Sequence, residues 1–172
     1  YVVTKFPRFP FDKFTTANRS LSTQMKATGE VMSIATNLEA GIMKAIRSLE
    51  ENVEYLKLDK LSDLEKSEVE ERLRIVDNER LFVIAEAIRK EISVERICEI
   101  TKIDRLFVGV VYKLVKMEKE LELNQMNSKL LEKAKKLGFT DKIITSEFAT
   151  TSLLSSVTLM PNWAFTFSLP GA

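Results

Sequence analysis

Residues 80–89 read Arg-Leu-Phe-Val-Ile-Ala-Glu-Ala-Ile-Arg, and only the two ends and Glu86 are charged. A helix built from this stretch is apolar nearly all round, which is typical of a helix buried at the centre of a domain. We therefore predict that residues 80–89 form the central helix of a mainly α fold, with the other helices packed around it.

Two helices are predicted after the central one. Ser93 can cap a short helix and Asp104 a longer one, because their side-chain oxygens can accept the free amides of a first turn. The short helix is expected to bury Val94, Ile97, Cys98 and Ile100. The long helix is expected to bury Leu106, Phe107, Val110, Val111, Leu114, Met117 and Leu121.

The helical region is predicted to run from about residue 36 to residue 146. A last helix should open at Asn127 or Ser128, and Gly138 can end it in a left-handed conformation, after which Phe139 packs back.

Three helix starts are predicted upstream. Thr36 and Ser62 are each followed by a glutamate three residues later, which is the pattern of a capping box. Asn78 can cap the central helix.

The N-terminal region has a different pattern. Residues 1–4 and 30–34 are rich in β-branched side chains and predict two strands. Two strands form a marginal sheet with open edges, so we expect this region to be the cut end of a larger domain. Four aromatic residues between the strands are expected to pack into a core: Phe6, Phe9, Phe11 and Phe14.

Composition excludes several kinds of chemistry. The chain of 172 residues has no histidine and a single cysteine, Cys98, so neither a His/Cys metal site nor an internal disulfide can form. The 26 Lys and Arg nearly balance the 25 Asp and Glu, so net charge selects no partner. No apolar run is long enough for a membrane span or a signal peptide, and we expect a soluble protein in a reducing compartment.

Catalytic motifs are also missing from the sequence. The five glycines are scattered, and no glycine-rich phosphate loop occurs. Carboxylates cluster at residues 50–51, at 70–71 and at Glu118, Glu120 and Glu122, but Lys and Arg surround them, so we interpret them as solvated helix faces. We assign no catalytic, cofactor-binding or metal-binding residue.

Residues 93–105 and the helix after them have the spacing of a helix-turn-helix DNA reader, which is the alternative function. A recognition helix presents polar side chains to base edges near its N-terminus, whereas this one begins with Leu106 and Phe107. We expect these side chains in a core. A basic cluster near the end of the helical region is interpreted as a solubilising surface: Lys129, Lys133, Lys135, Lys136 and Lys142.

Several passages together resemble one enzyme family. Residues 1–14 (YVVTKFPRFPFDKF) resemble the Y-V-V-T-K-I-P-R-F…F-x-K-F passage of the carbamoyl phosphate synthetase large subunit. Residues 23–34 (TQMKATGEVMSI) and 44–50 (KAIRSLE) are similar to its T-Q-M-K-S-x-G-E-V-M-(A/S)-I and K-A-x-R-S-L-E passages.

The resemblance continues in order to about residue 146. Residues 80–89 are similar to R-x-(F/W/Y)-x-I-A-x-A-x-R, residues 101–107 (TKIDRLF) to T-x-I-D-(R/K)-(W/F)-F, and residues 135–141 (KKLGFTD) to K-x-x-G-F-(S/T)-D. At 35–36 the chain has Ala-Thr where the family has Gly-Arg. After Glu147 it carries no charge for 25 positions, although residues 147–150 resemble a later E-F-A-T of the family.

The resemblance implies a fragment of an ATP-dependent ligase that makes carbamoyl phosphate from bicarbonate and glutamine-derived ammonia, for arginine and pyrimidine synthesis. The implied domains are residues 1–48, the last piece of the carboxyphosphate-forming ATP-grasp domain, and residues 49–146, a helical oligomerisation domain. Residues 147–172 are expected to be a tail that is disordered or foreign to the family.

The resemblance also implies cofactors, partners and a location. ATP and Mg²⁺ or Mn²⁺ belong to the intact parent, and none is expected in this fragment, which should be inactive alone. The implied partners are the rest of the large subunit, the glutaminase subunit or domain, and further copies of the chain, with no nucleic acid and no membrane. The location implied is cytoplasmic, or organellar in a eukaryote.

Overall fold

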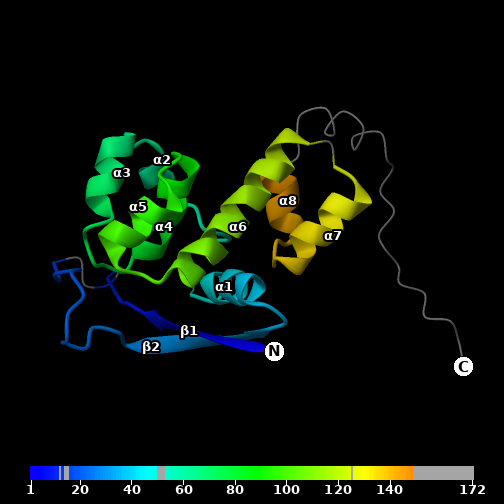
Figure 1. Cartoon of the computed structure of the whole chain (residues 1–172). Coiled ribbons are helices and arrows are strands. Elements are labelled where there is room, and N and C mark those ends of the chain that lie inside the picture. The colour runs from blue at the N-terminus through cyan, green and yellow to red at the C-terminus, as the bar shows by residue number, and fades with distance from the viewer. Residues whose placement is uncertain (12, 14–15, 50–52, 125, 149–172) are drawn as a thin grey trace, which may run out of the picture.

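The computed structural model describes residues 1–148 except 12, 14–15, 50–52 and 125 (Figure 1). In this part of the chain, a two-stranded antiparallel sheet precedes eight helices, which confirms the mainly α fold with a two-strand remnant. The elements are β1 (Val2–Arg8), β2 (Gly29–Ala35), α1 (Leu38–Arg47), α2 (Asp59–Ser62), α3 (Lys66–Arg72), α4 (Arg80–Arg89), α5 (Val94–Thr101), α6 (Arg105–Leu123), α7 (Ser128–Lys136) and α8 (Asp141–Glu147).

Both strands are longer than predicted. Val2 pairs with Ala35 at one end of the ladder and Arg8 with Gly29 at the other. Side chains alternate between the faces, as they must in a pleated strand. Thr4 and Ser33 are buried on one face, and the other face is exposed to solvent.

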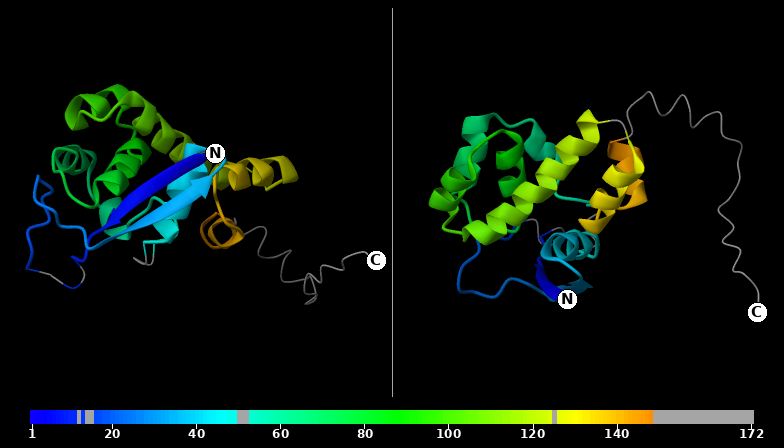
Figure 2. Two further views of the ribbon diagram at one scale, coloured as in Figure 1. Left: turned by 90° about the horizontal axis from the view of Figure 1, so that it is seen from below. Right: turned by 45° about the vertical axis from the view of Figure 1, so that its right-hand side comes forward.

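Helix α1 covers the buried face of the sheet and lies between the sheet and α6 (Figure 2). Gly41 makes this close packing possible, because a Cβ there would lie only 2.4 Å from Thr4 Oγ1. The Ser33 hydroxyl donates a hydrogen bond of 2.7 Å to the Gly41 carbonyl and fixes the helix on the strand. Lys44 of α1 also donates to the Ile34 carbonyl of β2 at 3.3 Å, so close packing and hydrogen bonds together join the sheet to α1.

The central position of α4 is confirmed. Every residue from Phe82 to Ile88 is buried, including Glu86, and the helix packs against α3, α5 and α6. The long helix α6 supplies the opposite wall of the core with Val108, Val110, Val111, Leu114, Val115, Met117 and Leu121. One continuous apolar core therefore runs through the helical part.

Three of the predicted caps are confirmed. The side chains of Ser93, Asp104 and Asn127 accept backbone amides at the starts of α5, α6 and α7. The predicted cap of α4 is wrong, because Asp77 accepts the amide of Glu79 while Asn78 makes no such bond.

Two other predicted caps are also wrong. Helix α1 is capped by Asn37, one residue after Thr36, because the Asn37 side chain accepts the Ala40 amide. Helix α3 begins at Lys66, where Glu65 and Glu68 form the capping box, because Ser62 ends the short helix α2. We did not predict α2 or α8.

Gly138 ends α7 with a φ of +92° and the left-handed cap is confirmed. A Cβ on this residue would lie 2.9 Å from Ala40 Cα, so glycine is also needed for the approach of α1. Phe139 is buried directly after it, as predicted, and contacts Phe148 edge to face. Phe14 and residues 149–172 of the expected tail lie outside the described residues.

None of the helices in the described ranges combines the length and the hydropathy that crossing a membrane requires.

Gly138→Ala is expected to lower the free energy of unfolding by about 2 kcal/mol, because it combines left-handed backbone strain with a clash against α1. Urea denaturation measures the change. Gly109→Ala is the matched control, since a Cβ on this glycine of α6 would meet open space. It should instead raise stability by about 0.5–1 kcal/mol through helix propensity. Equal effects at both positions would contradict the account of Gly138.

Candidate functional site

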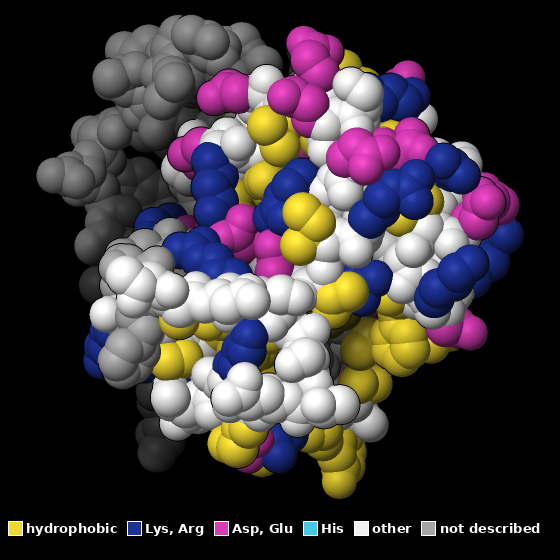
Figure 3. All heavy atoms as spheres, turned by 90° about the vertical axis from the view of Figure 1, so that its left-hand side faces the viewer, with side chains coloured by type: hydrophobic (Ala, Val, Ile, Leu, Met, Phe, Trp, Pro, Cys, Tyr) yellow, Lys and Arg dark blue, Asp and Glu magenta, His cyan; other side chains and the backbone are white. Residues whose placement is uncertain are grey.

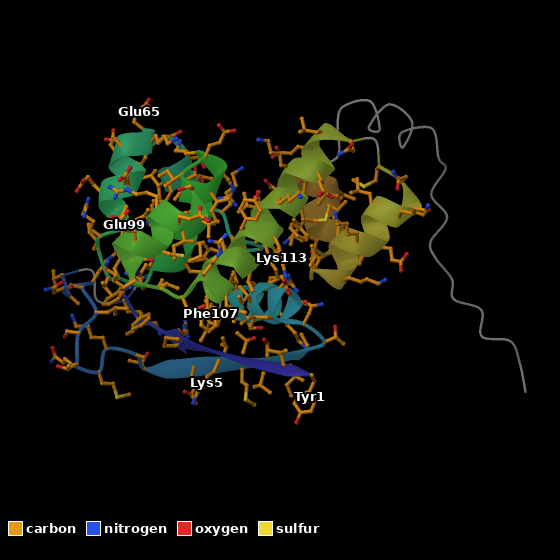
Figure 4. All side chains as sticks on the ribbon, in the orientation of Figure 1. Tyr1, Lys5, Glu65, Glu99, Phe107 and Lys113 are labelled. Atoms are coloured by element: carbon orange, nitrogen blue, oxygen red, sulfur yellow. The ribbon has the colours of Figure 1, made fainter. Side chains whose placement is uncertain are left out.

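The start of α6 carries the clearest departure from the sequence prediction. Leu106 is 64% exposed and Phe107 is 52% exposed, although both were expected in the core. Leu106 shares a helix face with the exposed Lys113, seven residues on, so it points away from the core. Phe107 lies at the end of α6 that is nearest the sheet (Figure 4). The predicted burial of Val110 and Val111 is confirmed, and Val108 is buried as well.

In the helix-turn-helix alternative, α6 is the recognition helix, and its outward face would contact the nucleic acid. Its cations Arg105 and Lys113 bind carboxylates of the same chain: Arg105 lies 2.7 Å from Glu95, and Lys113 lies 2.9 Å from Glu39. Four lysines of the basic cluster are paired in the same way: Lys133, Lys135, Lys136 and Lys142. Paired cations and exposed apolar side chains are a poor match to base edges and phosphates.

A second exposed apolar surface is the outer face of the sheet. Tyr1, Val3, Met32 and Ile34 are exposed there, and Val3 lies opposite Ile34 in the ladder. Tyr1 and Lys5 point away from the helices (Figure 4). Figure 3 shows hydrophobic side chains along the lower edge of the molecule, where Figure 1 places the strands. Because both edges of this two-stranded sheet are also unpaired within the described residues, the sheet can accept further structure.

Inside the helical part, Arg89 joins three segments. Its Nε and one terminal nitrogen hold both oxygens of Glu118 on α6, at 2.9 and 3.0 Å. That terminal nitrogen also donates to the carbonyl of Leu56 at 2.7 Å, and the other donates to Glu86 at 3.1 Å. A bidentate guanidinium–carboxylate pair fixes both distance and orientation, so Arg89 sets the spacing between α4 and α6.

Glu118 corrects our interpretation of the carboxylates as solvated. It is 4% exposed, whereas Glu122, one turn further on, is exposed. Burial raises the pKa of the Glu118 carboxyl to about 7, and the charge of Arg89 opposes that rise. The sequence prediction missed this pair, although Glu86 within the most apolar helix and Arg89 at its end were a signal, because a buried charged group needs a partner.

A second ion cluster attaches the N-terminal loop. Glu79 is buried and receives Lys60 of α2 at 2.6 Å, Arg19 at 3.1 Å and Arg72 of α3 at 3.4 Å. The backbone amide of Leu21 also donates to the Val76 carbonyl at 2.7 Å. The loop between the strands is therefore bound to the helical part by charge as well as by packing.

The charged groups in both clusters pair with other charged groups of the same chain. Over the described ranges, no three acidic, cysteine or histidine side chains are grouped closely enough to hold a metal ion. The absence of any assigned catalytic or cofactor-binding residue remains a prediction. The arrangement can bind protein surface through α6 and the sheet, and those two faces are the candidate functional site.

Glu118→Gln is expected to change how stability depends on pH. The folded-state pKa lies above the ordinary value of 4.5, so native protein binds more protons than unfolded chain between pH 4.5 and about 7. Stability contributed by this group is therefore lost as the pH rises through that window. Relative to Glu118→Gln, the wild type should lose about 3 kcal/mol of unfolding free energy there, measured by urea denaturation.

Glu71→Gln, at an exposed position of α3, is the control and should parallel the wild type, whereas Glu122 is unsuitable because its charge helps to raise the pKa of Glu118. An advantage of the wild type over Glu118→Gln that grew as the pH rose would show that Arg89 outweighs burial.

Comparison with known families bears on these surfaces. The family model described as carbamoyl-phosphate synthetase large chain, oligomerisation domain, matches residues 30–156. The match spans most of the chain, from β2 through α8, and gives the nucleic-acid alternative no support. The matched range begins within the predicted domain of residues 1–48 and ends within the predicted tail of residues 147–172. It therefore tests neither domain boundary, and both stay predictions. The chain belongs to the carbamoyl-phosphate synthetase large-chain family and carries its oligomerisation domain.

Proposed function

We propose that this chain is the spacer and subunit-association segment of a carbamoyl phosphate synthetase large chain, without a complete active site. The observation that carries the proposal is the contrast between a closed helical core and two uncovered apolar faces, on the sheet and on α6. A stable folded unit with two such faces can connect two bodies.

The sheet is the side that joins the rest of the large chain. Its inner face is closed by α1, while its outer face and both edges are free within the described residues. Such a sheet is completed by more strands or by a covering layer. The resemblance of residues 1–14 to the family assigns that role to the carboxyphosphate-forming half of the parent enzyme.

The helical side is the one that associates with further copies. The matched family model is that of an oligomerisation domain, and α6 presents exposed apolar side chains on an otherwise well packed helix. Large apolar side chains in water favour association, because their burial removes unfavourable contacts with solvent.

The chemistry of the parent belongs to other parts of that enzyme. We propose that the parent makes carbamoyl phosphate from bicarbonate, ammonia and ATP with Mg²⁺ or Mn²⁺, and that a glutaminase subunit or domain supplies the ammonia. No ligand of ATP or metal could be carried over to any residue of this chain, which supports an inactive fragment. We further propose a cytoplasmic location, or an organellar one in a eukaryote.

Self-association is expected to depend on concentration. Sedimentation equilibrium of the full 172-residue chain should show a weight-average mass that rises above the monomer mass of 19.7 kDa as concentration increases. A mass that stayed at the monomer value up to the solubility limit would overturn the association role.

The isolated chain is expected to lack nucleotide chemistry. Incubation with ATP, Mg²⁺ and bicarbonate should release no phosphate above the rate of a buffer control, because the parts of the parent that bind ATP are not in this chain. Saturable phosphate release that required bicarbonate would contradict the spacer proposal.

A further inference from the structure

Gly109 occupies an unusual place on the outward face of α6. It lies in the second turn of a 19-residue helix, and a Cβ built on it would meet nothing within 4 Å. Glycine is among the poorest helix formers, and α6 packs no neighbour closely at this point. Gly41 and Gly138, by contrast, each allow a close approach inside the chain. The described structure therefore contains no internal reason for glycine at 109.

The residues around Gly109 show what could lie there. Leu106 and Tyr112 stand three positions before and after it, and they are 64% and 45% exposed. In a helix, positions three apart lie on one side, so these two apolar side chains flank a bare stretch of backbone. A flat backbone patch between two apolar side chains fits the crossing of another helix.

We propose that two copies of the chain associate through α6, with the two helices crossing at Gly109. The inference rests on the proposed self-association and specifies its contact surface. A second copy is the expected occupant because the matched family model is that of an oligomerisation domain, and because the pattern is symmetric about Gly109.

A twofold axis through the crossing explains this symmetry. In an antiparallel crossing at Gly109, position 106 of one helix faces position 112 of the other, and the reverse contact follows from the axis. Leu106 of each copy then packs on Tyr112 of its partner. Because no side chain separates the backbones at Gly109, the helices approach closely enough for both contacts.

The charges next to the crossing are already compensated. The same axis brings Arg105 of one copy near Lys113 of the other, and two cations would repel. Each arrives with its own carboxylate, however: Glu95 lies 2.7 Å from Arg105, and Glu39 lies 2.9 Å from Lys113. Ion pairs thus border the contact between Leu106 and Tyr112 of the two copies, as is typical of the polar rim around an apolar contact.

The contact surface continues along α6. Tyr112 and Lys116 also line a groove of about 460 Å³ between α6 and the segment that joins α4 to α5. The two exposed apolar side chains at the crossing, Leu106 and Tyr112, contribute roughly 200 Å² per copy, whereas a stable interface needs about 800 Å². The walls of this groove, which adjoin the contact between Leu106 and Tyr112, can supply the rest of the buried area.

Two substitutions at the crossing test the inference on the full chain. Gly109→Ala should weaken self-association at least tenfold, and Gly109→Leu should leave only monomer at concentrations where the wild type associates, because each added side chain separates the backbones. Both substitutions favour the helix, so thermal unfolding should occur at the wild-type temperature or above. Ser67→Leu, at an exposed position of α3, is the control for an added leucine and should associate like the wild type.

A disulfide test measures the geometry directly. In a Cys98→Ala background, the double variant Leu106→Cys/Tyr112→Cys, which leaves Gly109 unchanged, should form a covalent dimer under mild oxidation, because position 106 of one copy faces position 112 of the other. Ser67→Cys in the same background should form no covalent dimer.

The outcomes separate this inference from the proposed function. Association that survives Gly109→Ala and Gly109→Leu, together with no covalent dimer of the Leu106→Cys/Tyr112→Cys variant, would overturn the α6 crossing and leave self-association in place through another surface. A wild type that stays monomeric at every concentration would overturn both.

Discussion

The guanidinium of Arg89 joins α4, α6 and the segment before α2 through hydrogen bonds. It binds both oxygens of Glu118 on α6, Glu86 on its own helix and the Leu56 carbonyl in the segment before α2. Removal of one partner of a buried pair leaves an uncompensated charge and typically costs about 3–5 kcal/mol. Loss of either partner would therefore weaken the packing of α4 against α6, around which the apolar core is built.

The pair also makes the core sensitive to protons. Since burial raises the pKa of Glu118 to about 7, the carboxyl changes its charge in a range where few other side chains of this histidine-free chain titrate. The proton and Arg89 compete for one carboxylate. Structural ion pairs shift pKa values as catalytic groups do, so this shift by itself assigns Glu118 no catalytic role.

The polar contacts that connect the sheet, the N-terminal loop and the helices lie inside the chain and leave its outer surfaces free for association. Gly41 and Ser33 attach α1 to the sheet, and Glu79 gathers three cations from the N-terminal loop, α2 and α3. These contacts keep the sheet and the helices in one body, so the uncovered sheet face and α6 are held in a constant relation. The proposed spacer role requires such a fixed arrangement of the two faces.

The sequence alone determined features that depend on a few neighbouring residues. The caps at Ser93, Asp104 and Asn127 and the left-handed end at Gly138 follow from bonds within one helical turn, and the apolar periodicity of α4 follows from its composition. The family pattern was recognisable for the same reason, since its passages are short and contiguous.

Tertiary structure alone decided which side chains on α6 meet water. Glu118 looked like part of a charged surface and is buried with Arg89, whereas Leu106 looked like core and is exposed. Burial depends on which distant segment lies against a helix face, and no local pattern specifies that neighbour.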